Sequence, residues 1–276
     1  MEKRNELKVS LVVPVYNGAD YIVHFLQIAL GQTLSDIEII LVDDCSTDDW
    51  LSRANAFLKG REDADAVRVR FLSTPVNGGP GAARNIGLAG AVGKYVCFVD
   101  CDDEIAPDYC ESLYCEAEKY SADMVCCDAL TDGKLLKSPD FTPGVLTEKG
   151  RAAILLSFVT RLWTYMFCRK FLIDNNIHFP QTRSSEDTAF VTLAWLKAGR
   201  ASHLPKALYN YIPQPGSLSR RKMHDRAHQR LESMRFIKVN SGKPGFAVSM
   251  ALKLMIMKKG WLMVLKDFLT TQPDLV

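Results

Sequence analysis

The sequence lacks any apolar run of the roughly 18 residues that a membrane-spanning helix requires. Its nearest approach, residues 246–269, is interrupted by four lysines, a glycine and an aspartate. This segment therefore predicts an amphipathic helix or a pair of helices. The charged N-terminus runs straight into an apolar strand, without the apolar core of a signal peptide. We therefore expect the protein to be made and kept in the cytoplasm.

The sequence is also poor in net charge and in metal-binding cysteine patterns. Its formal net charge of +2 is too small for the basic surface of a nucleic-acid-binding protein, so we expect no nucleic-acid partner. The eight cysteines form no CxxC pair and no cysteine–histidine cluster with the spacing of a structural zinc site. In a reducing compartment, nearly all of them are expected to be small buried hydrophobic residues.

What the first half does contain is an alternation of short apolar runs with helical patterns. Four runs are almost continuously apolar, as in strands buried on both faces of a parallel sheet: 9–15, 37–43, 67–72 and 95–100. Three helical patterns lie between these runs: 20–30, 47–59 and 82–91. The alternation predicts βαβ units, and therefore an α/β fold with a mostly parallel central sheet.

The second half of the sequence changes character. After an apolar run at 124–128, helical patterns dominate and few clear strands remain. The helical patterns cover 147–159, 187–198, 224–239 and 246–258. A stretch containing proline and glycine marks a boundary near 215–225. We therefore expect one core domain over residues 1–215, followed by a helical C-terminal extension over residues 216–276.

Polar and acidic residues follow three of the four apolar runs in the first half. They are Tyr16 and Asn17, then Asp43 and Asp44, then Asp100, Asp102 and Asp103. Because ligands bind outside the carboxyl ends of parallel strands, we expect these residues to converge at one edge of the sheet. Two unit charges about 4 Å apart repel by about 4 kcal/mol at an effective dielectric of 20. The cluster therefore predicts a hard divalent cation, completed by substrate phosphates, although a turn or capping role is favoured for Asp43.

Five strings of residues stand in a fixed order along the chain. They are VVPVYN (12–17), VDDCSTDD (42–49), NGGPGAARNIGL (77–88), FVDCDDE (98–104) and SEDTAF (185–190). Together, over about residues 8–215, they resemble the family 2 glycosyltransferases, which have the A-type nucleotide-sugar-binding fold. The segments on either side of SEDTAF look like the bacterial branch that builds capsule, lipopolysaccharide and other surface polysaccharides. Cys45 and Cys101 depart from the usual pattern at positions that carry no required charge.

The resemblance divides the catalytic domain into a nucleotide-binding half, about residues 8–128, and an acceptor half, about 129–215. It implies nucleotide-binding roles for Pro14, Tyr16, Asn17, Asp44, Arg84 and Asp100. Tyr16 can offer a ring face to the base and Asp44 a strong acceptor to the imide N–H of uracil, so a UDP-sugar is the expected donor. Packing at the strand end explains Tyr16 equally well, and a solvated helix charge is the alternative for Arg84.

The resemblance further implies a divalent cation, Mn²⁺ or Mg²⁺, at the DxD motif formed by Asp100 and Asp102. Asp102 would coordinate the ion directly. Asp100 would hold the ribose or reach the ion through a water molecule. Asp103 would either support these ligands from behind or contact the donor sugar.

The SEDTAF string carries the candidate catalytic residues. The resemblance implies that Asp187 is the general base that takes the proton of the acceptor hydroxyl, and that Glu186 positions the acceptor. Both are expected in the first turn of a helix, where the helix dipole favours anions, so capping is the alternative role. Trp163 and Tyr165 are candidates for an apolar wall against a sugar, although Trp163 fits a core position at least as well.

The function expected from these residues is inverting, metal-dependent transfer of a sugar from a UDP-sugar to a hydroxyl of a saccharide or lipid-linked glycan. Residues 246–269 are expected either to rest on the cytoplasmic membrane face as a peripheral contact or to pack on the catalytic domain or a partner subunit. A sugar-nucleotide nucleotidyltransferase is an alternative, but residues 12–21 offer one glycine and no lysine for a triphosphate loop. A non-catalytic sugar-nucleotide-binding protein is a second alternative. The presence of Asp100, Asp102 and Asp187 together disfavours it.

Overall fold

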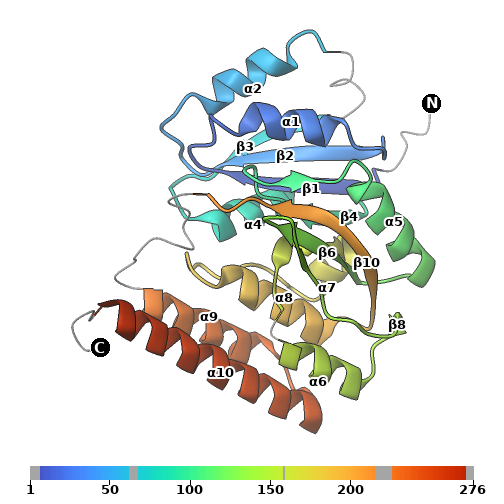
Figure 1. Cartoon of the computed structure of the whole chain (residues 1–276), viewed down its shortest axis with the longest axis vertical. Helices are drawn as coiled ribbons and strands as arrows, with labels where there is room; N and C mark the ends of the chain where they lie inside the picture. The colour runs from blue at the N-terminus through green and yellow to red at the C-terminus, as the bar shows by residue number, and fades with distance from the viewer. Residues whose placement is uncertain (1–6, 62–67, 158, 215–225, 272–276) are drawn as a thin grey trace.

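A single mixed sheet organises the protein, seen in a computed structural model (Figure 1). The structure describes residues 7–61, 68–157, 159–214 and 226–271, without the side chains of residues 68, 226, 227 and 259–271. Within these ranges the sheet has ten strands in the order β3-β2-β1-β4-β9-β6-β10-β5, with β7 paired to β6 and β8 paired to β10. The boundary predicted near residues 215–225 lies outside the described residues.

The first half of the chain forms the parallel part of the sheet. Its strands are β1 (Val9–Val15), β2 (Ile37–Asp43), β3 (Arg68–Ser73) and β4 (Tyr95–Phe98). β1 lies between β2 and β4, and β2 pairs with β3, all in parallel. Six of the seven residues of β1 and of β2 are buried, as near-continuous apolar runs predict for strands covered on both faces. The predicted α/β fold with a mostly parallel central sheet is therefore confirmed.

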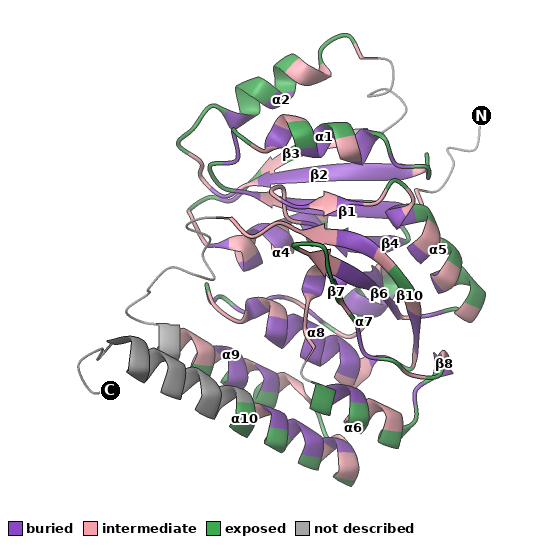
Figure 2. Cartoon of the chain, viewed as in Figure 1, coloured by how far each residue is buried: buried purple, intermediate pink, exposed green. Residues whose placement is uncertain are grey.

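Helices cover both faces of the sheet. The sheet separates the core into two hydrophobic clusters, one on each face. The helices of the first half are α1 (Ile22–Leu30), α2 (Trp50–Leu58), α4 (Pro80–Gly90) and α5 (Tyr109–Tyr120). Alternate side chains of β1 point to opposite faces, so that Leu11 and Val13 pack with α1, α2 and α5 while Val12 packs with α4. Figure 2 shows the buried sheet between these layers.

The chain after β4 contributes more strands than its sequence predicts. They are β5 (Glu104–Ile105), β6 (Met124–Thr131), β7 (Lys134–Leu136), β8 (Gly144–Val145), β9 (Tyr165–Cys168) and β10 (Arg200–Tyr211). The expectation of few strands is wrong above all for β10, which pairs in parallel with β6. β10 contains Pro205, and its register shifts twice between Leu204 and Tyr209, so its sequence shows neither a continuous apolar run nor a simple alternation.

The helices of the second half pack together below the sheet (Figure 1). They are α6 (Glu148–Ser157), the 3₁₀ turn Leu162–Thr164, α7 (Arg169–Asp174), α8 (Glu186–Lys197), α9 (Arg226–Asn240) and α10 (Phe246–Thr271). α9 packs on α8, and α10 packs on α6 and α9. Ile237 and Met255 belong to the same hydrophobic cluster as Phe190 of α8. None of the helices in the described ranges is both long and apolar enough to cross a membrane.

One fully buried carboxylate joins the parallel strands. Glu38 of β2 accepts hydrogen bonds from Ser10 Oγ of β1 (2.6 Å) and from the Val92 amide N–H (2.7 Å), and it pairs with Arg70 Nη1 of β3 (3.0 Å). Burial raises the pKa of Glu38, but the donors from Ser10, Val92 and Arg70 outweigh it and hold the pKa below its ordinary value of 4.5. The ionised carboxylate therefore stabilises the folded sheet.

We predict that Glu38→Gln lowers the free energy of unfolding by about 2–3 kcal/mol, because the amide group turns one acceptor into a donor that faces other donors. Urea unfolding at pH 7 measures this loss. Asp174→Asn is the matched control, since Asp174 and its partner Lys170 are both exposed and the loss of this pair should cost about 0–1 kcal/mol.

The same substitution has a predicted pH dependence. Because folding lowers the pKa of Glu38, its contribution is complete above pH 4.5 and disappears as the pH falls through the lower folded-state pKa. The stability difference between wild type and Glu38→Gln should therefore shrink below pH 4.5. A difference that is constant from pH 7 to pH 3 would contradict the assignment of the ionised state.

Candidate functional site

The carboxyl ends of β1, β2 and β4 meet at one edge of the sheet, and the polar residues predicted there converge on it. Asn17 follows β1 with a positive φ of 53°. Its backbone N–H donates to Ser46 Oγ (3.0 Å), and its side-chain oxygen accepts from the Thr47 N–H (2.8 Å). These bonds tie the loop after β1 to the loop after β2. They also explain why α2 begins at Trp50 rather than at residue 47 as predicted.

Asp44 organises the glycine-rich turn that leads into α4. Its carboxylate is almost fully buried and accepts hydrogen bonds from Thr74 Oγ1 (2.8 Å) and from the backbone N–H groups of Gly78 (2.9 Å) and Gly79 (2.7 Å). Gly79 has a φ of 83°, a conformation that favours glycine. The buried carboxylate therefore fixes the turn through its acceptor positions.

Tyr16 and Pro14 lie beside this turn at the end of β1. The Tyr16 side chain is 50% exposed, so it is not a packed strand-end residue and its ring remains accessible. Pro14 is partly buried and pairs with Val42 in the register of β1 and β2. The end of β1 thus carries an accessible ring and a rigid backbone, and the Val15 carbonyl there accepts a hydrogen bond from the Asp44 N–H (2.8 Å).

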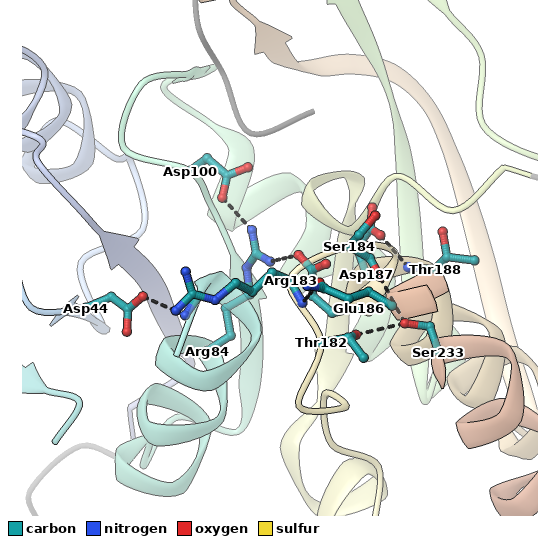
Figure 3. A network of polar contacts seen from close by, with 12 residues as sticks. Asp44, Arg84, Asp100, Thr182, Arg183, Ser184, Glu186, Asp187, Thr188 and Ser233 are labelled. Atoms are coloured by element: carbon teal, nitrogen blue, oxygen red, sulfur yellow. Dashed lines mark hydrogen bonds and ion pairs between the residues drawn. The ribbon is translucent and has the colours of Figure 1, made fainter. Parts of the chain in front are cut away.

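Arg84 joins two parts of the chain that are a hundred residues apart (Figure 3). It lies in the second turn of α4 with its side chain 8% exposed. Its Nη2 pairs with Asp100 Oδ1 (2.7 Å), and its Nη1 pairs with Glu186 Oε1 (3.3 Å). The solvated helix charge considered as an alternative is therefore wrong, because this guanidinium is buried between two carboxylates.

The DxD motif lies just after β4, and its carboxylates differ in exposure. The Asp100 side chain is 31% exposed and uses one oxygen for Arg84. Burial and the charge of Asp100 raise the pKa of Asp102 to about 6. In the part of the chain that the structure describes, no three His, Cys, Asp or Glu side chains are grouped to hold a metal ion by themselves. Two neighbouring carboxylates at a strand end nevertheless fit a hard cation that takes its remaining ligands from phosphates and water.

Asp103 faces the protein interior. Its Oδ2 accepts from the Tyr209 hydroxyl (2.7 Å) and its Oδ1 from the Ile212 N–H (2.8 Å). Burial and the charge of Asp100 raise the pKa of Asp103 to about 8. The Tyr209 hydroxyl also accepts from the Asp100 N–H (3.3 Å). Because both Asp103 oxygens are bonded to the end of β10 and the residue that follows it, the geometry favours a supporting role over contact with the donor sugar.

Glu186 and Asp187 begin α8, as predicted. Glu186 is 8% exposed, and burial together with the charge of Asp187 raises its pKa to about 7 although Arg84 lowers it. Asp187 is more exposed than Glu186, and its Oδ1 accepts from the Thr188 N–H (2.6 Å). The two carboxylates therefore differ: Glu186 is held inside by Arg84, whereas Asp187 lies nearer to solvent at the helix start.

Sequence reasoning missed the residues of α9 that hold the loop before α8. Ser233 Oγ lies 2.8 Å from Thr182 Oγ1 and donates to the Ser184 carbonyl (3.0 Å), and Gln229 Oε1 accepts from the Arg183 N–H (2.8 Å). Sequence reasoning also missed Tyr209, although the alternating YNY at 209–211 points two aromatic rings to one face of a strand.

Of the two residues predicted to form an apolar wall against a sugar, Trp163 and Tyr165, the structure places Tyr165 in the core. Tyr165 is fully buried in the core and lies within hydrogen-bond distance of Trp195 Nε1 (3.3 Å), so it cannot face a sugar. Trp163 is partly exposed, and its ring stacks on Tyr209 (4.4 Å between centroids) and Tyr211 (5.8 Å). The prediction for Tyr165 assumed that it shares a strand face with Trp163, two residues before it. Residues two apart share a face only within one strand, and Trp163 lies in the 3₁₀ turn before β9.

Known proteins are similar to this chain in sequence. EpsJ of Bacillus subtilis, an uncharacterized glycosyltransferase, is 34% identical over 221 residues, which cover 76% of this chain and 62% of EpsJ. The glycosyltransferase GlyG of Streptococcus pneumoniae is 31% identical over 225 residues, which cover 77% of this chain and 73% of GlyG. The match thus spans less than two thirds of the length of EpsJ.

A solved structure shares the fold at similar identity. Residues 1–349 of Staphylococcus aureus TarS, in complex with UDP-GlcNAc, align with a TM-score of 0.74 and 27% identity, covering 88% of this chain and 69% of that one. The family model named Glycosyl transferase family 2 matches residues 10–148, from within β1 to the start of α6. That match covers half of the chain and includes the loops after β1, β2 and β4, and the chain therefore belongs to glycosyl transferase family 2.

Proposed function

We propose that the protein is an inverting glycosyltransferase that passes a sugar from a UDP-sugar to a hydroxyl acceptor during the synthesis of a bacterial cell-surface polysaccharide. The observation that carries this proposal is the bridge from Asp100 through Arg84 to Glu186. It brings the motif expected at the donor phosphates next to the motif expected to activate the acceptor. A donor and an acceptor bound at the two motifs would thus lie side by side at one edge of the sheet.

The loops after β1 and β2 would bind the nucleotide. The exposed ring of Tyr16, with Pro14 and Asn17 beside it, would line the base pocket, and the Asp44 carboxylate would receive the uracil N–H. The UDP-GlcNAc bound in TarS supports a UDP-sugar as the donor class. A nucleotidyltransferase is less well supported, because the loop after β1 offers neither a lysine nor a second glycine for a triphosphate.

Asp102 and the free oxygen of Asp100 would hold a divalent cation, Mn²⁺ or Mg²⁺. When bound, the cation would neutralise charge on the diphosphate leaving group. Asp103 would fix the loop from behind through Tyr209, which also accepts from the Asp100 N–H. The protein's own contribution here is to hold these carboxylates close together and partly desolvated.

Asp187 would act as the general base and Glu186 would position the acceptor. Asp187 lies in the first turn of α8 and is the less buried of the two carboxylates. A base that removes the acceptor proton on the face opposite the leaving UDP gives a single displacement, which inverts the configuration at the anomeric carbon.

The C-terminal helices would place the enzyme at a membrane that carries a lipid-linked acceptor. One face of α10 packs on α6 and α9. Exposed residues recur along the helix (Figure 2), and four of them are large and apolar. Phe246 is 82% exposed, Met250 45%, Leu254 46% and Met257 63%, and their spacing of three or four residues forms one stripe. Lys253 and Lys258 are exposed on the same helix. An apolar stripe flanked by lysines suits the surface of an anionic bilayer.

The domain organisation is part of the proposal. We place the catalytic domain at residues 1–215, with its nucleotide half at about 8–128 and its acceptor half at about 129–215. The helical extension at 216–276 would then have two tasks. Ser233 and Gln229 would hold the loop before Asp187, and the outer face of α10 would meet the lipid.

The metal assignment predicts that Asp102→Asn removes the dependence of UDP affinity on Mn²⁺ while the fold persists, because Asp102 lies in a loop beyond a strand end. Titration calorimetry of UDP with and without Mn²⁺ measures this effect. Asp174→Asn, an exposed aspartate on α7, should retain the wild-type response. An Asp102→Asn protein with the wild-type Mn²⁺ effect would exclude Asp102 as a ligand.

The base assignment predicts that Asp187→Asn lowers transfer about 10²–10⁴-fold, because the amide cannot accept the proton. A thermal-shift screen of nucleotide sugars with and without Mn²⁺ first identifies the donor. The affinity for UDP and the metal should stay unchanged, and Glu186→Gln should lower transfer less. NMR coupling constants should give a product configuration opposite to that of the donor. Wild-type transfer by Asp187→Asn, or a retained configuration, would rule out this mechanism.

The membrane contact predicts flotation with liposomes that contain anionic phospholipid, and little flotation with purely zwitterionic ones. A Phe246→Asp and Met250→Asp double variant should lose most of this binding, because both substitutions place charge in the apolar stripe. Val145→Asp is the matched control, since Val145 is 69% exposed on β8, far from the stripe in sequence. A wild-type protein that stays at the bottom of the gradient would show that the stripe does not bind lipid.

A further inference from the structure

The guanidinium of Arg84 is enclosed within the protein. The residue is 7% exposed, and its guanidinium carbon lies 5.7 Å from the centroid of the Phe179 ring. Nη1 and Nη2 are engaged by Glu186 and Asp100, and Nε is buried without a hydrogen-bond partner among the described residues. A side chain in this position has its terminal donors committed to protein carboxylates and little surface to offer to a nucleotide.

Arg84 neutralises a crowded group of carboxylates. Asp100 and Glu186 pair with its two terminal nitrogens, and Asp187 follows Glu186 in the first turn of α8. Without the guanidinium, Asp100 and Glu186 would repel each other across a poorly solvated space, where charges interact more strongly than in water. The bridge therefore determines where the Glu186 carboxylate lies. Because Glu186 is the first residue of α8, it also affects where Asp187, the next residue, is held.

Close packing fixes the same contact independently of charge. A Cβ atom on Gly81 of α4 would lie 3.1 Å from Glu186 Cγ and 3.3 Å from Phe179 Cβ. A Cβ atom on Gly79 would lie 3.0 Å from Arg183 Cγ. The first turn of α4 and the first turn of α8 thus pack directly against each other. The glycine-rich turn and the SEDTAF segment are therefore in close contact.

We propose that Arg84 is a positioning residue that sets the first turn of α8, and with it Asp187, rather than a residue that contacts the nucleotide. This inference rests on the proposed function, because it assigns to Arg84 a role in the acceptor step of that reaction. Arg84 acts through Glu186 on the acceptor side, and its bond to Asp100 couples that position to the donor side.

The test compares Arg84→Gln, Glu186→Gln and the double variant in transfer kinetics and in UDP affinity without divalent cation. Arg84→Gln should lower kcat about 100-fold and change the UDP affinity less than threefold. The double variant should be no slower than Arg84→Gln alone, because the residue through which Arg84 acts is then already displaced. Arg84→Lys, which keeps the charge but cannot span both carboxylates, should retain about a tenth of wild-type kcat.

Two outcomes would overturn the proposal. A tenfold or greater loss of UDP affinity in Arg84→Gln, with kcat nearly unchanged, would mean that the guanidinium binds the nucleotide directly, since a charge-assisted contact contributes at least that factor. Independent, multiplying losses of kcat in the double variant would mean that Arg84 does not act through Glu186.

A measurement that needs no turnover separates this proposal from the proposed function. The carboxyl carbon of Glu186 can be followed by NMR in protein labelled with ¹³C-glutamate, with Glu186→Gln identifying its signal. In Arg84→Gln its pKa, about 7 in the wild type, should rise because the neighbouring cation is lost. An unchanged titration would overturn the positioning contact. A wild-type protein that binds no UDP and transfers no sugar would instead refute the proposed function alone.

Discussion

The repulsion between carboxylates at one edge of the sheet is the constraint that shapes this site. The parallel strands of the first half deliver several acidic side chains to the same edge, and each is stabilised differently. Asp44 accepts the N–H groups of a glycine turn, whereas Asp103 is bonded to the end of β10 and the residue after it. Asp100 and Glu186 share the buried guanidinium of Arg84. The carboxylates at this edge therefore hold the loops in place through their hydrogen bonds and ion pairs.

Much of the fold and part of the site could be predicted from the sequence, for a physical reason. β1 and β2 are nearly continuous apolar runs, so their burial can be predicted from composition, and the residues that follow them converge by topology. β10 escaped prediction because it is ordered by pairing with β6, which is distant in sequence, and because its register is irregular. Contacts such as Tyr209 with Asp103 leave no local signal, because each partner is unremarkable in its own segment.

The C-terminal helices contact the loop that leads to the candidate catalytic residues, although the sequence predicts only a helical extension. α9 shares a hydrophobic cluster with α8, and Ser233 bonds to the loop that leads to Glu186. The loop has no regular structure of its own, so its position depends on this support. The motif that is expected to activate the acceptor is therefore held from two sides, by α4 through Arg84 and by α9 through Ser233.

The buried carboxylate of Glu38 bears on how the sheet avoids misalignment. β1 and β2 are apolar on both faces, so sliding one strand along the other would still bury apolar side chains and would change the hydrophobic free energy little. In the observed register Ser10 lies opposite Glu38 and donates to it. A register shifted by one residue would place the buried carboxylate opposite Val9 or Leu11, without the Ser10 donor, at a cost of several kcal/mol. A single polar pair thereby selects one alignment among several that hydrophobicity alone would barely distinguish.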